Sequence, residues 1–290
     1  MRVLVATDLS DAADVALREG AAMASMAGDA LAVVHALPAL PFLEMWLPQF
    51  AEDRATVARR ASDAVRERAR TVLGDRATEV FVEDEVDYAA VVKRAEEWKA
   101  DVVVVGSHGR SGLARAFGGV AERVLRYARC SVLVARPLGP RGPVLAATDL
   151  SDPSFHAITA AASEARRRGA TLEVVHALGL LEAEAIYLLE LGTPSITPPP
   201  GVYEAAANQL SECVARLHVD ATCKVLDRPA VAAIVREAEA ISAELVVASA
   251  RGKTELHLLP LGSVAEKVAR AASCSVLVVR PGVPGRSPQR

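Results

Sequence analysis

The sequence contains two copies of one long pattern, and this duplication constrains the fold more than any other feature. The segment RVLVATDLSD at Arg2–Asp11 returns as PVLAATDLSD at Pro143–Asp152. Near the end of each copy, CSVLVARP at Cys130–Pro137 returns as CSVLVVRP at Cys274–Pro281. Equivalent residues lie 141 positions apart at the start of the pattern and 144 at its end, which indicates a few short insertions in loops. Self-similarity over this length indicates two copies of a whole domain.

Length and composition agree with a globular protein of two domains. The chain has 290 residues, of which 51% are hydrophobic and 24% are charged. Each half is long enough to bury a core of its own. We predict a first domain at residues 1–137 and a second at residues 143–281, joined by a short segment rich in Pro and Gly. The net charge of −3 argues against nucleic acid as a partner.

From the sequence we expect neither a membrane segment nor a secretion signal. No apolar run approaches the roughly 18 residues that a membrane-spanning helix needs. The first residues, MRVLVATDLSD, lead directly into a strand pattern and lack the apolar core and cleavage site of a signal peptide. We therefore expect a cytoplasmic protein with no membrane partner.

Short, continuous apolar runs predict the strands of each half. In the first half they lie at Val3–Ala6, Leu31–Ala36, Val102–Val105 and Val132–Ala135, with a weaker amphipathic run at Thr78–Glu83. The second half repeats the strands at Val144–Ala147, Leu172–Ala177, Ala221–Leu226, Leu245–Ala248 and Val276–Val279. Continuous rather than alternating runs are typical of parallel strands that are covered on both faces. Helical patterns lie between the strands of the first half, from Ser10 or Asp11 to about Ala27, over Ala51–Leu73 and Tyr88–Lys99, and from Gly118 to about Ala128.

The order βαβαβαβαβ predicts an α/β fold with two tandem doubly wound domains, each with a five-stranded parallel sheet. Sister domains on a short linker can use the contact that separate chains use in a homodimer, so we expect a pseudo-twofold relation between them. After its second strand each half carries an irregular apolar stretch, at Leu37–Phe50 and at Ile186–Tyr203. Such a stretch can fold over its own domain, pack between the domains or form a partner-binding patch, and the residues leave these alternatives open.

Three segments of each half converge at one place in this fold. Ligands of doubly wound sheets bind beyond the carboxyl ends of the strands, where the strand order reverses. There the first half brings together the ends of strands one and two with a loop that reads GSHG, eight residues and then GGV. The second half has SARG, nine residues and then GSV. Glycines let backbone N–H groups approach an anion, and a helix start adds its positive dipole end, so the loop predicts a phosphate site.

These residues resemble the universal stress proteins. The resemblance rests on ATDLSD, VVHA and the pattern G-x2-G-x9-G-[ST] followed by VAEKV, and it covers essentially the whole chain in two copies. It implies a Rossmann-like fold of the adenine nucleotide alpha hydrolase type. In the nucleotide-binding branch of that family the glycine motif holds the phosphates of ATP. The strand-one Asp and the backbone at the end of strand two hold the adenosine.

The resemblance therefore implies a set of nucleotide-binding residues in each copy. In the first copy these are Thr7, Asp8, Ala36, Val105, Gly106, Gly109, Gly118, Gly119 and Val120. In the second copy they are Thr148, Asp149, Ala177, Ala248, Ser249, Gly252, Gly262, Ser263 and Val264. The implied cofactor is ATP, with ADP and AMP as alternatives and Mg²⁺ compatible with the phosphates. A homodimer is also compatible with the resemblance.

Neither copy matches the glycine pattern fully. The first copy has a spacer one residue shorter, and Gly119 stands where the pattern has a hydroxyl residue. The second copy keeps the spacer and Ser263, but Ser249 replaces the first glycine, which matters only if that position needs a positive φ. We therefore expect the second copy to favour the triphosphate and the first to discriminate poorly between ATP, ADP and AMP.

The other candidate residues predict no catalytic centre. His35 and His176 end buried strands and are interpreted as structural residues, and Asp8 and Asp149 could instead cap the helices that follow them. Arg251 could touch a phosphate or be solvated. Because no paired carboxylates, nucleophile–base pair or metal-ligand spacing is present, we expect no enzyme. The leading hypothesis is a nucleotide-binding regulatory protein of the stress response. The alternatives are a nucleotide-independent interaction protein and a slow ATPase.

Overall fold

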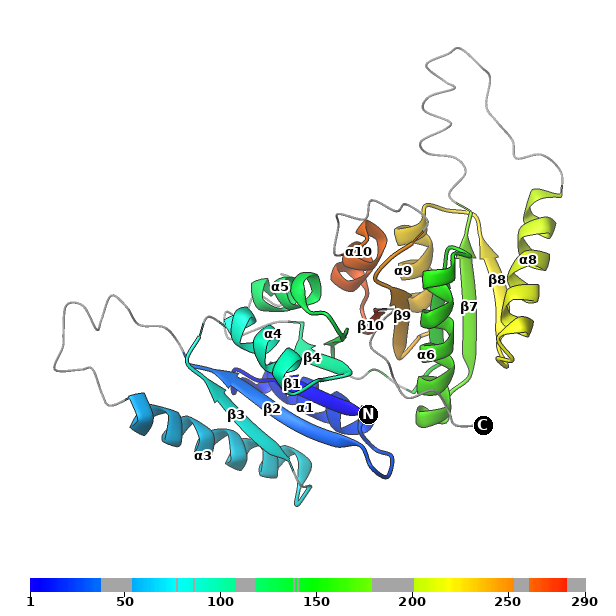
Figure 1. Ribbon diagram of the computed structural model, residues 1–290. Coiled ribbons are helices and arrows are strands. Elements are labelled where there is room, and N and C mark those ends of the chain that lie inside the picture. Colours follow the sequence, from blue (N-terminus) through cyan, green and yellow to red (C-terminus); the bar gives the residue numbers. More distant parts are fainter. Residues whose placement is uncertain are drawn as a thin grey trace, which may run out of the picture. The chain divides into compact units, whose positions relative to one another are not determined.

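The computed structural model describes residues 1–37, 54–76, 78–85, 87–107, 118–137, 139, 141–178, 201–252 and 261–280. The chain divides into two compact units, Met1–Pro137 and Leu138–Pro281 (Figure 1). Most of the two apolar stretches predicted after the second strands lies outside the described residues, and so does Gly109. The pseudo-twofold relation between the units stays a prediction.

The first unit is a parallel sheet between two pairs of helices (Figure 1). Its strands are β1 (Arg2–Ala6), β2 (Ala30–Ala36), β3 (Glu79–Glu83), β4 (Val102–Gly106) and β5 (Ser131–Ala135), in the order β3-β2-β1-β4-β5. Its helices are α1 (Asp11–Met23), α3 (Arg54–Leu73), α4 (Asp87–Glu97) and α5 (Gly119–Tyr127). Helix α1 packs with α3, and α4 packs with α5. The strand order reverses between β1 and β4, which sets the place of a ligand site.

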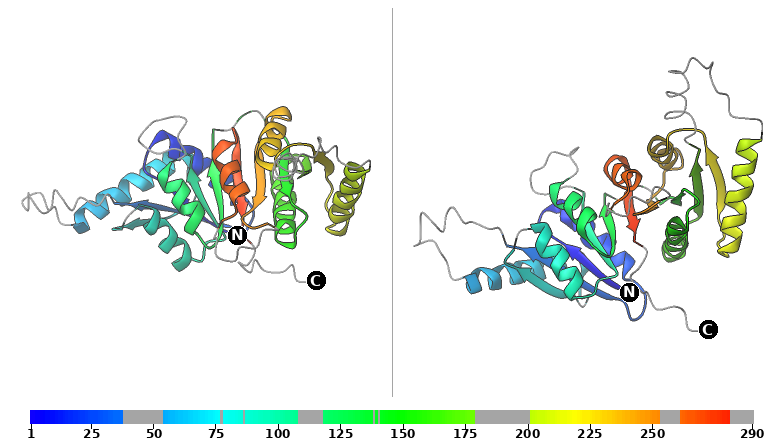
Figure 2. Two further views of the ribbon diagram at one scale, coloured as in Figure 1. Left: turned by 90° about the horizontal axis from the view of Figure 1, so that it is seen from above. Right: turned by 45° about the horizontal axis from the view of Figure 1, so that its top comes forward.

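The second unit repeats this arrangement. Its strands are β6 (Val144–Thr148), β7 (Leu172–Ala177), β8 (Thr222–Leu226), β9 (Leu245–Ser249) and β10 (Ser275–Val279), in the order β8-β7-β6-β9-β10. Its helices are α6 (Asp152–Arg168), α8 (Val202–Arg216), α9 (Ala230–Ala240) and α10 (Ser263–Ala271). Helix α9 packs with α10, α6 lies against β6 and β9, and α8 lies against β8 (Figures 1 and 2). The doubly wound parallel fold predicted from the sequence is therefore confirmed in both units.

The central strands form the core of each unit because helices cover both of their faces. Val3, Leu4 and Val5 in β1, and Val144 and Leu145 in β6, are all completely buried. Among the described residues, no helix has both the length and the apolar character that crossing a membrane requires.

One predicted helix end is wrong. Helix α1 begins after the N-cap Ser10, as expected, but it ends at Met23 rather than near Ala27. Arg76 explains the early end, because its guanidinium donates hydrogen bonds to the carbonyls of Ala21, at 2.8 Å, and of Ala24. A side chain from the turn before β3 thus satisfies the last carbonyls of α1, which local sequence does not reveal.

Candidate functional site

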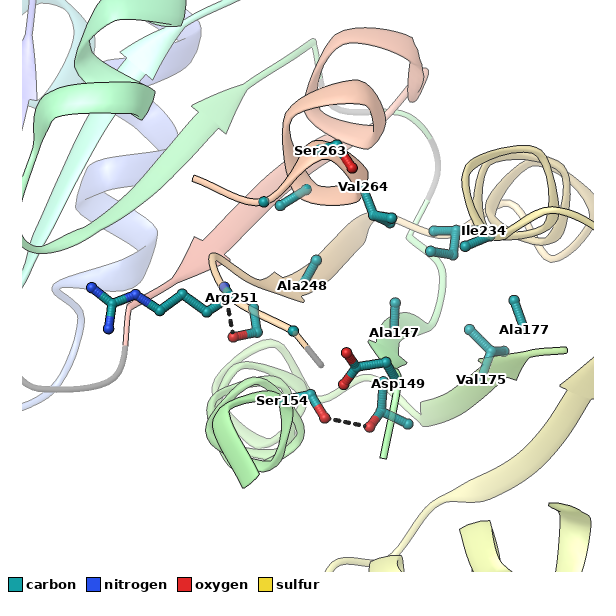
Figure 3. Close-up of a pocket in the computed structure, with 16 residues that line it drawn as sticks. Ala147, Asp149, Ser154, Val175, Ala177, Ile234, Ala248, Arg251, Ser263 and Val264 are labelled. Atoms are coloured by element: carbon teal, nitrogen blue, oxygen red, sulfur yellow. Dashed lines mark hydrogen bonds between the residues drawn. The ribbon is translucent and has the colours of Figure 1, made fainter. Parts of the chain in front are cut away.

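A cavity opens at the carboxyl ends of the strands in the second unit, where the strand order reverses (Figure 3). All nine residues predicted for this copy line it: Thr148, Asp149, Ala177, Ala248, Ser249, Gly252, Gly262, Ser263 and Val264. They come from the ends of β6, β7 and β9 and from the start of α10. Residues that are up to 116 positions apart in the sequence are therefore neighbours around one space.

The cavity of the second unit has an apolar end and a polar end. In Figure 3 the side chains of Val175, Ala177 and Ile234 gather on one side, and Ser263 lies on the other. The guanidinium of Arg251 points away from both Asp149 and Ser263, although the residue lines the cavity. A flat apolar group fits the first end, and an anion fits the second.

The turn after the first strand of each unit presents its Asp in the same way. In the second unit Oδ1 of Asp149 accepts hydrogen bonds from the backbone N–H of Ser151, at 3.1 Å, and from its hydroxyl, at 2.5 Å. The hydroxyl of Thr148 accepts from the N–H of Leu150 at 3.0 Å, and Leu150 itself has a left-handed φ of 63°. A leucine in this region costs roughly 1–2 kcal/mol, so the hydrogen bonds of the turn hold a strained backbone in place.

The first unit contains the same turn. Oδ1 of Asp8 accepts from the N–H and hydroxyl of Ser10, and Leu9 has a φ of 65°. The N-cap of α1 is Ser10, whose hydroxyl accepts from the N–H of Ala13 at 3.3 Å. The Asp therefore orients the cap residue and does not cap the helix itself, which answers the alternative raised by the sequence.

The two histidines at the ends of the second strands hold these turns. Nδ1 of His35 lies 2.9 Å from the carbonyl oxygen of Thr7, and Nδ1 of His176 lies 2.9 Å from that of Thr148. A carbonyl oxygen only accepts, so Nδ1 carries the proton in both units. This agrees with the structural role predicted for His35 and His176.

Gly252 is a glycine because of its closeness to Asp149. Its φ is not positive, so its backbone does not need the freedom of glycine. A Cβ atom at this position would lie 2.4 Å from Oδ2 of Asp149, closer than carbon and oxygen can approach without a shift. The second glycine of the motif therefore leaves room for the carboxylate at the mouth of the site.

Ser249 fits the place of the first motif glycine without strain. It ends β9 with no positive φ. Its hydroxyl donates to the carbonyl of Pro153 at 3.1 Å and accepts from the N–H of Arg251 at 3.3 Å. The departure of the second copy from the glycine pattern thus carries no backbone cost.

The glycine before each site helix is anchored in the same way in both units. The N–H of Gly262 donates to the carbonyl of Ala250 at 2.8 Å, and that of Gly118 donates to the carbonyl of Ser107 at 3.0 Å. The one-residue difference in loop length therefore falls between these anchors and leaves the helix start in place. A shorter loop in the first copy predicts either that Gly118 and Gly119 lie nearer Gly109 or that the phosphate cavity is less enclosed. Because Gly109 lies outside the described residues, this stays a prediction.

The first unit has its own cavity at the corresponding place. Eight of the nine predicted residues line it, namely Thr7, Asp8, Ala36, Val105, Gly106, Gly118, Gly119 and Val120, while Gly109 lies outside the described residues. Its volume is about 310 Å³, against about 140 Å³ in the second unit. Ile234 and Ser263 of the second cavity are larger than their counterparts Val91 and Gly119, whereas Ala230 is smaller than its counterpart Asp87.

Several lining residues were missed by the sequence analysis. Those on α4 and α9 are Asp87, Val91, Ala230 and Ile234, and Ser154 on α6 bonds to Thr148 with 2.7 Å between their hydroxyl oxygens. The two helices are offset by 143 residues throughout, so the sequence could have identified Asp87 with Ala230 and Val91 with Ile234 as equivalent pairs. It could not show that these residues face the cavity, because that depends on how each helix packs. Among the described residues, no three His, Cys, Asp or Glu side chains are grouped as they would be around a metal ion.

The model of the universal stress protein family matches this chain twice, at residues 1–136 and 140–280. The chain belongs to the universal stress protein family. A universal stress protein of Mycobacterium bovis is 33% identical over 301 residues, with 96% of each chain covered. Another, from Mycobacterium tuberculosis, is 30% identical over 298 residues, again with 96% of each chain covered. Both relatives span both units of the chain.

Solved structures support the fold over the same span. The crystal structure of a universal stress protein from Archaeoglobus fulgidus matches with a TM-score of 0.64 at 18% identity, covering 97% of this chain and 98% of that one. The family model matches each half of the chain, and a relative of similar length matches across both halves, as the predicted tandem arrangement requires. The resemblance to the universal stress proteins is therefore confirmed.

Proposed function

We propose that this universal stress protein binds adenine nucleotides and acts as a regulatory protein of the stress response, with ATP occupancy changing its shape or its partners. The observation that carries the proposal is the cavity of the second unit, which all nine predicted residues line at the switch point of the sheet. An apolar end faces a polar end across that cavity, as the base and the phosphates of a nucleotide require.

The residues of the second unit divide between the two parts of the ligand. The apolar side chains Val175, Ala177 and Ile234 suit the faces of a base, and Asp149 suits the adenosine. The first N–H groups of α10, with the exposed hydroxyl of Ser263, suit the phosphates. A cavity of about 140 Å³ encloses only part of a nucleotide, so the phosphates would lie over the exposed start of α10.

We further propose that the protein is not an enzyme. Among the described residues, the polar groups that line the second cavity are the carboxylate of Asp149, hydroxyls, backbone N–H groups and Arg251, and such groups bind and orient a nucleotide. Oδ1 of Asp149 is engaged by Ser151 at 2.5 Å and 3.1 Å, so this oxygen holds the turn. The site therefore fits nucleotide binding with conformational coupling better than it fits catalytic turnover.

Isothermal titration calorimetry of the full chain tests the proposal, with ATP, AMP and ribose 5-phosphate as a non-nucleotide control. We expect ATP and AMP to bind and the control not to bind. Ser263→Ala should weaken ATP about tenfold at one site, and AMP less, because it removes a hydrogen bond to a charged phosphate for which water competes at this exposed position.

Ser163→Ala is the matched control, since this exposed α6 hydroxyl donates to the carbonyl of Thr159 and does not line the cavity. The proposal fails if the wild-type chain binds neither nucleotide. The phosphate assignment fails if Ser263→Ala weakens ATP and AMP equally.

A further inference from the structure

The helix that lines the first cavity, α4, carries a charged residue that its counterpart in the second unit, α9, lacks. Asp87 and Val91 of α4 line the first cavity one helical turn apart, and Ala230 and Ile234 of α9 line the second at the equivalent positions. The first unit thus presents a carboxylate where the second presents a methyl group. The two pockets therefore differ in what they can accept at this wall.

The Asp87 carboxylate differs from two acidic residues near it in the sequence, because those two form ion pairs. Glu83 pairs with Arg94, and Glu85 pairs with Lys93. No residue that the structure describes forms an ion pair with Asp87 or donates a hydrogen bond to it. An acidic residue also favours a helix start, but α9 forms with Ala230 in the same place, so the fold does not require the charge.

The surroundings of Asp87 indicate which part of a ligand it would meet. Val34 and Ala36 of β2 and Val91 of α4 form the apolar end of the first cavity, while Gly118 and Gly119 lie at the helix start that suits phosphates. In the second unit, the equivalents Val175, Ala177 and Ile234 gather on the side of the cavity away from Ser263 (Figure 3). Asp87 therefore stands at the base end and away from the phosphate end.

We propose that Asp87 is a specificity-determining residue that accepts a hydrogen bond from the 6-amino group of adenine in the first pocket. This inference rests on the proposed function, because it assigns the base of the nucleotide. An ionised carboxylate only accepts hydrogen bonds. Adenine offers N–H donors at position 6, whereas hypoxanthine offers a carbonyl oxygen that the carboxylate repels. The first pocket should therefore reject inosine nucleotides more strongly than the second.

Each pocket can be measured in the full chain when the other is closed. Ala177→Trp fills the base end of the second cavity, and Ala36→Trp fills the equivalent end of the first. Calorimetry with AMP and IMP then gives the ratio of their affinities for each pocket. We expect the ratio in the first pocket to exceed that in the second by about tenfold, because Asp87 is exposed and water competes for the hydrogen bond.

Exchanging Asp87 and Ala230 tests whether the carboxylate causes the difference between the pockets in the AMP-to-IMP affinity ratio. Asp87→Ala should lower the AMP-to-IMP ratio of the first pocket to that of the second, and Ala230→Asp should raise the ratio of the second pocket. Glu96→Ala is the matched control, because it removes a charge from the same helix and breaks only an exposed pair with Arg129. Thermal melts of each variant identify any that fails to fold, and Asp87→Asn then replaces Asp87→Ala.

The results separate this inference from the proposed function. If AMP binds and Asp87→Ala leaves the AMP-to-IMP ratio unchanged, only the role of Asp87 is overturned. Tighter binding of GMP than AMP by the first pocket also overturns it. If neither pocket binds AMP, the proposed function fails and the assignment of Asp87 fails with it.

Discussion

Replacing Gly119 by Ser gives the first unit the hydroxyl that Ser263 provides in the second. Gly119 is the first residue of α5, and a Cβ atom built there meets no atom within 4 Å. Its φ is not positive, so the backbone already suits a residue with a side chain. Ser is a better helix former than Gly by a few tenths of a kcal/mol. The substitution should therefore leave the fold intact.

The expected gain follows from the position of the new hydroxyl. A hydrogen bond to a charged phosphate is worth about 1.5–3 kcal/mol, or ten- to a hundredfold in affinity. Gly119 is exposed at the helix start, so water competes for the bond and the gain should lie near tenfold. ATP should gain more than AMP, because the hydroxyl addresses the phosphate tail. Because Gly118 is anchored to Ser107 as Gly262 is to Ala250, the substitution should work without an added loop residue.

Calorimetry of the full chain with Ala177→Trp measures the first pocket alone. Gly119→Ala is the matched control, since it adds the same Cβ and similar helix stability without a hydroxyl. We expect Gly119→Ser to raise ATP affinity about tenfold and Gly119→Ala to change it little. Equal effects of the two substitutions would refute the hydroxyl argument. A wild-type first pocket that already binds ATP more tightly than the second would show that cavity volume outweighs the hydroxyl.

Three further predictions concern the second unit. Burial and the neighbouring Glu237 raise the pKa of Glu173 above its ordinary 4.5. The stability that the protonated carboxyl of Glu173 contributes is therefore fully present below pH 4.5 and is lost as the pH rises through the raised pKa. Glu173→Gln should therefore raise the melting temperature at pH 7 and change it little at pH 4, which a melting series across this range checks. Gly252→Ala should displace the carboxylate of Asp149 and lower nucleotide affinity at the second pocket about tenfold by calorimetry, with no change at the first. Leu150→Gly relieves a left-handed residue but adds chain entropy, so urea unfolding should show a change within about 1 kcal/mol, while Leu150→Val should destabilise by more.

The sequence alone was enough to predict the fold and most of the site. The duplicated pattern indicated two domains, and continuous apolar runs such as Val102–Val105 indicated buried parallel strands. Parallel strands that share a sheet have their carboxyl ends at one edge, so Asp149, Ala177 and Ser249 had to be neighbours once the strands were located. This part of the site follows from local patterns and from topology.

The tertiary structure determined the features of the site that depend on distances between segments far apart in the sequence. Gly252 lies against the carboxylate of Asp149, and the left-handed φ of Leu150 is held by hydrogen bonds of its own turn. The roles of Asp87 and Ala230 depend on which turn of α4 and α9 faces the cavity, and a helical pattern leaves that rotation open until the helix packs. Local propensity predicts an element, but only packing between distant elements determines which atoms meet, because those contacts have no signature in neighbouring residues.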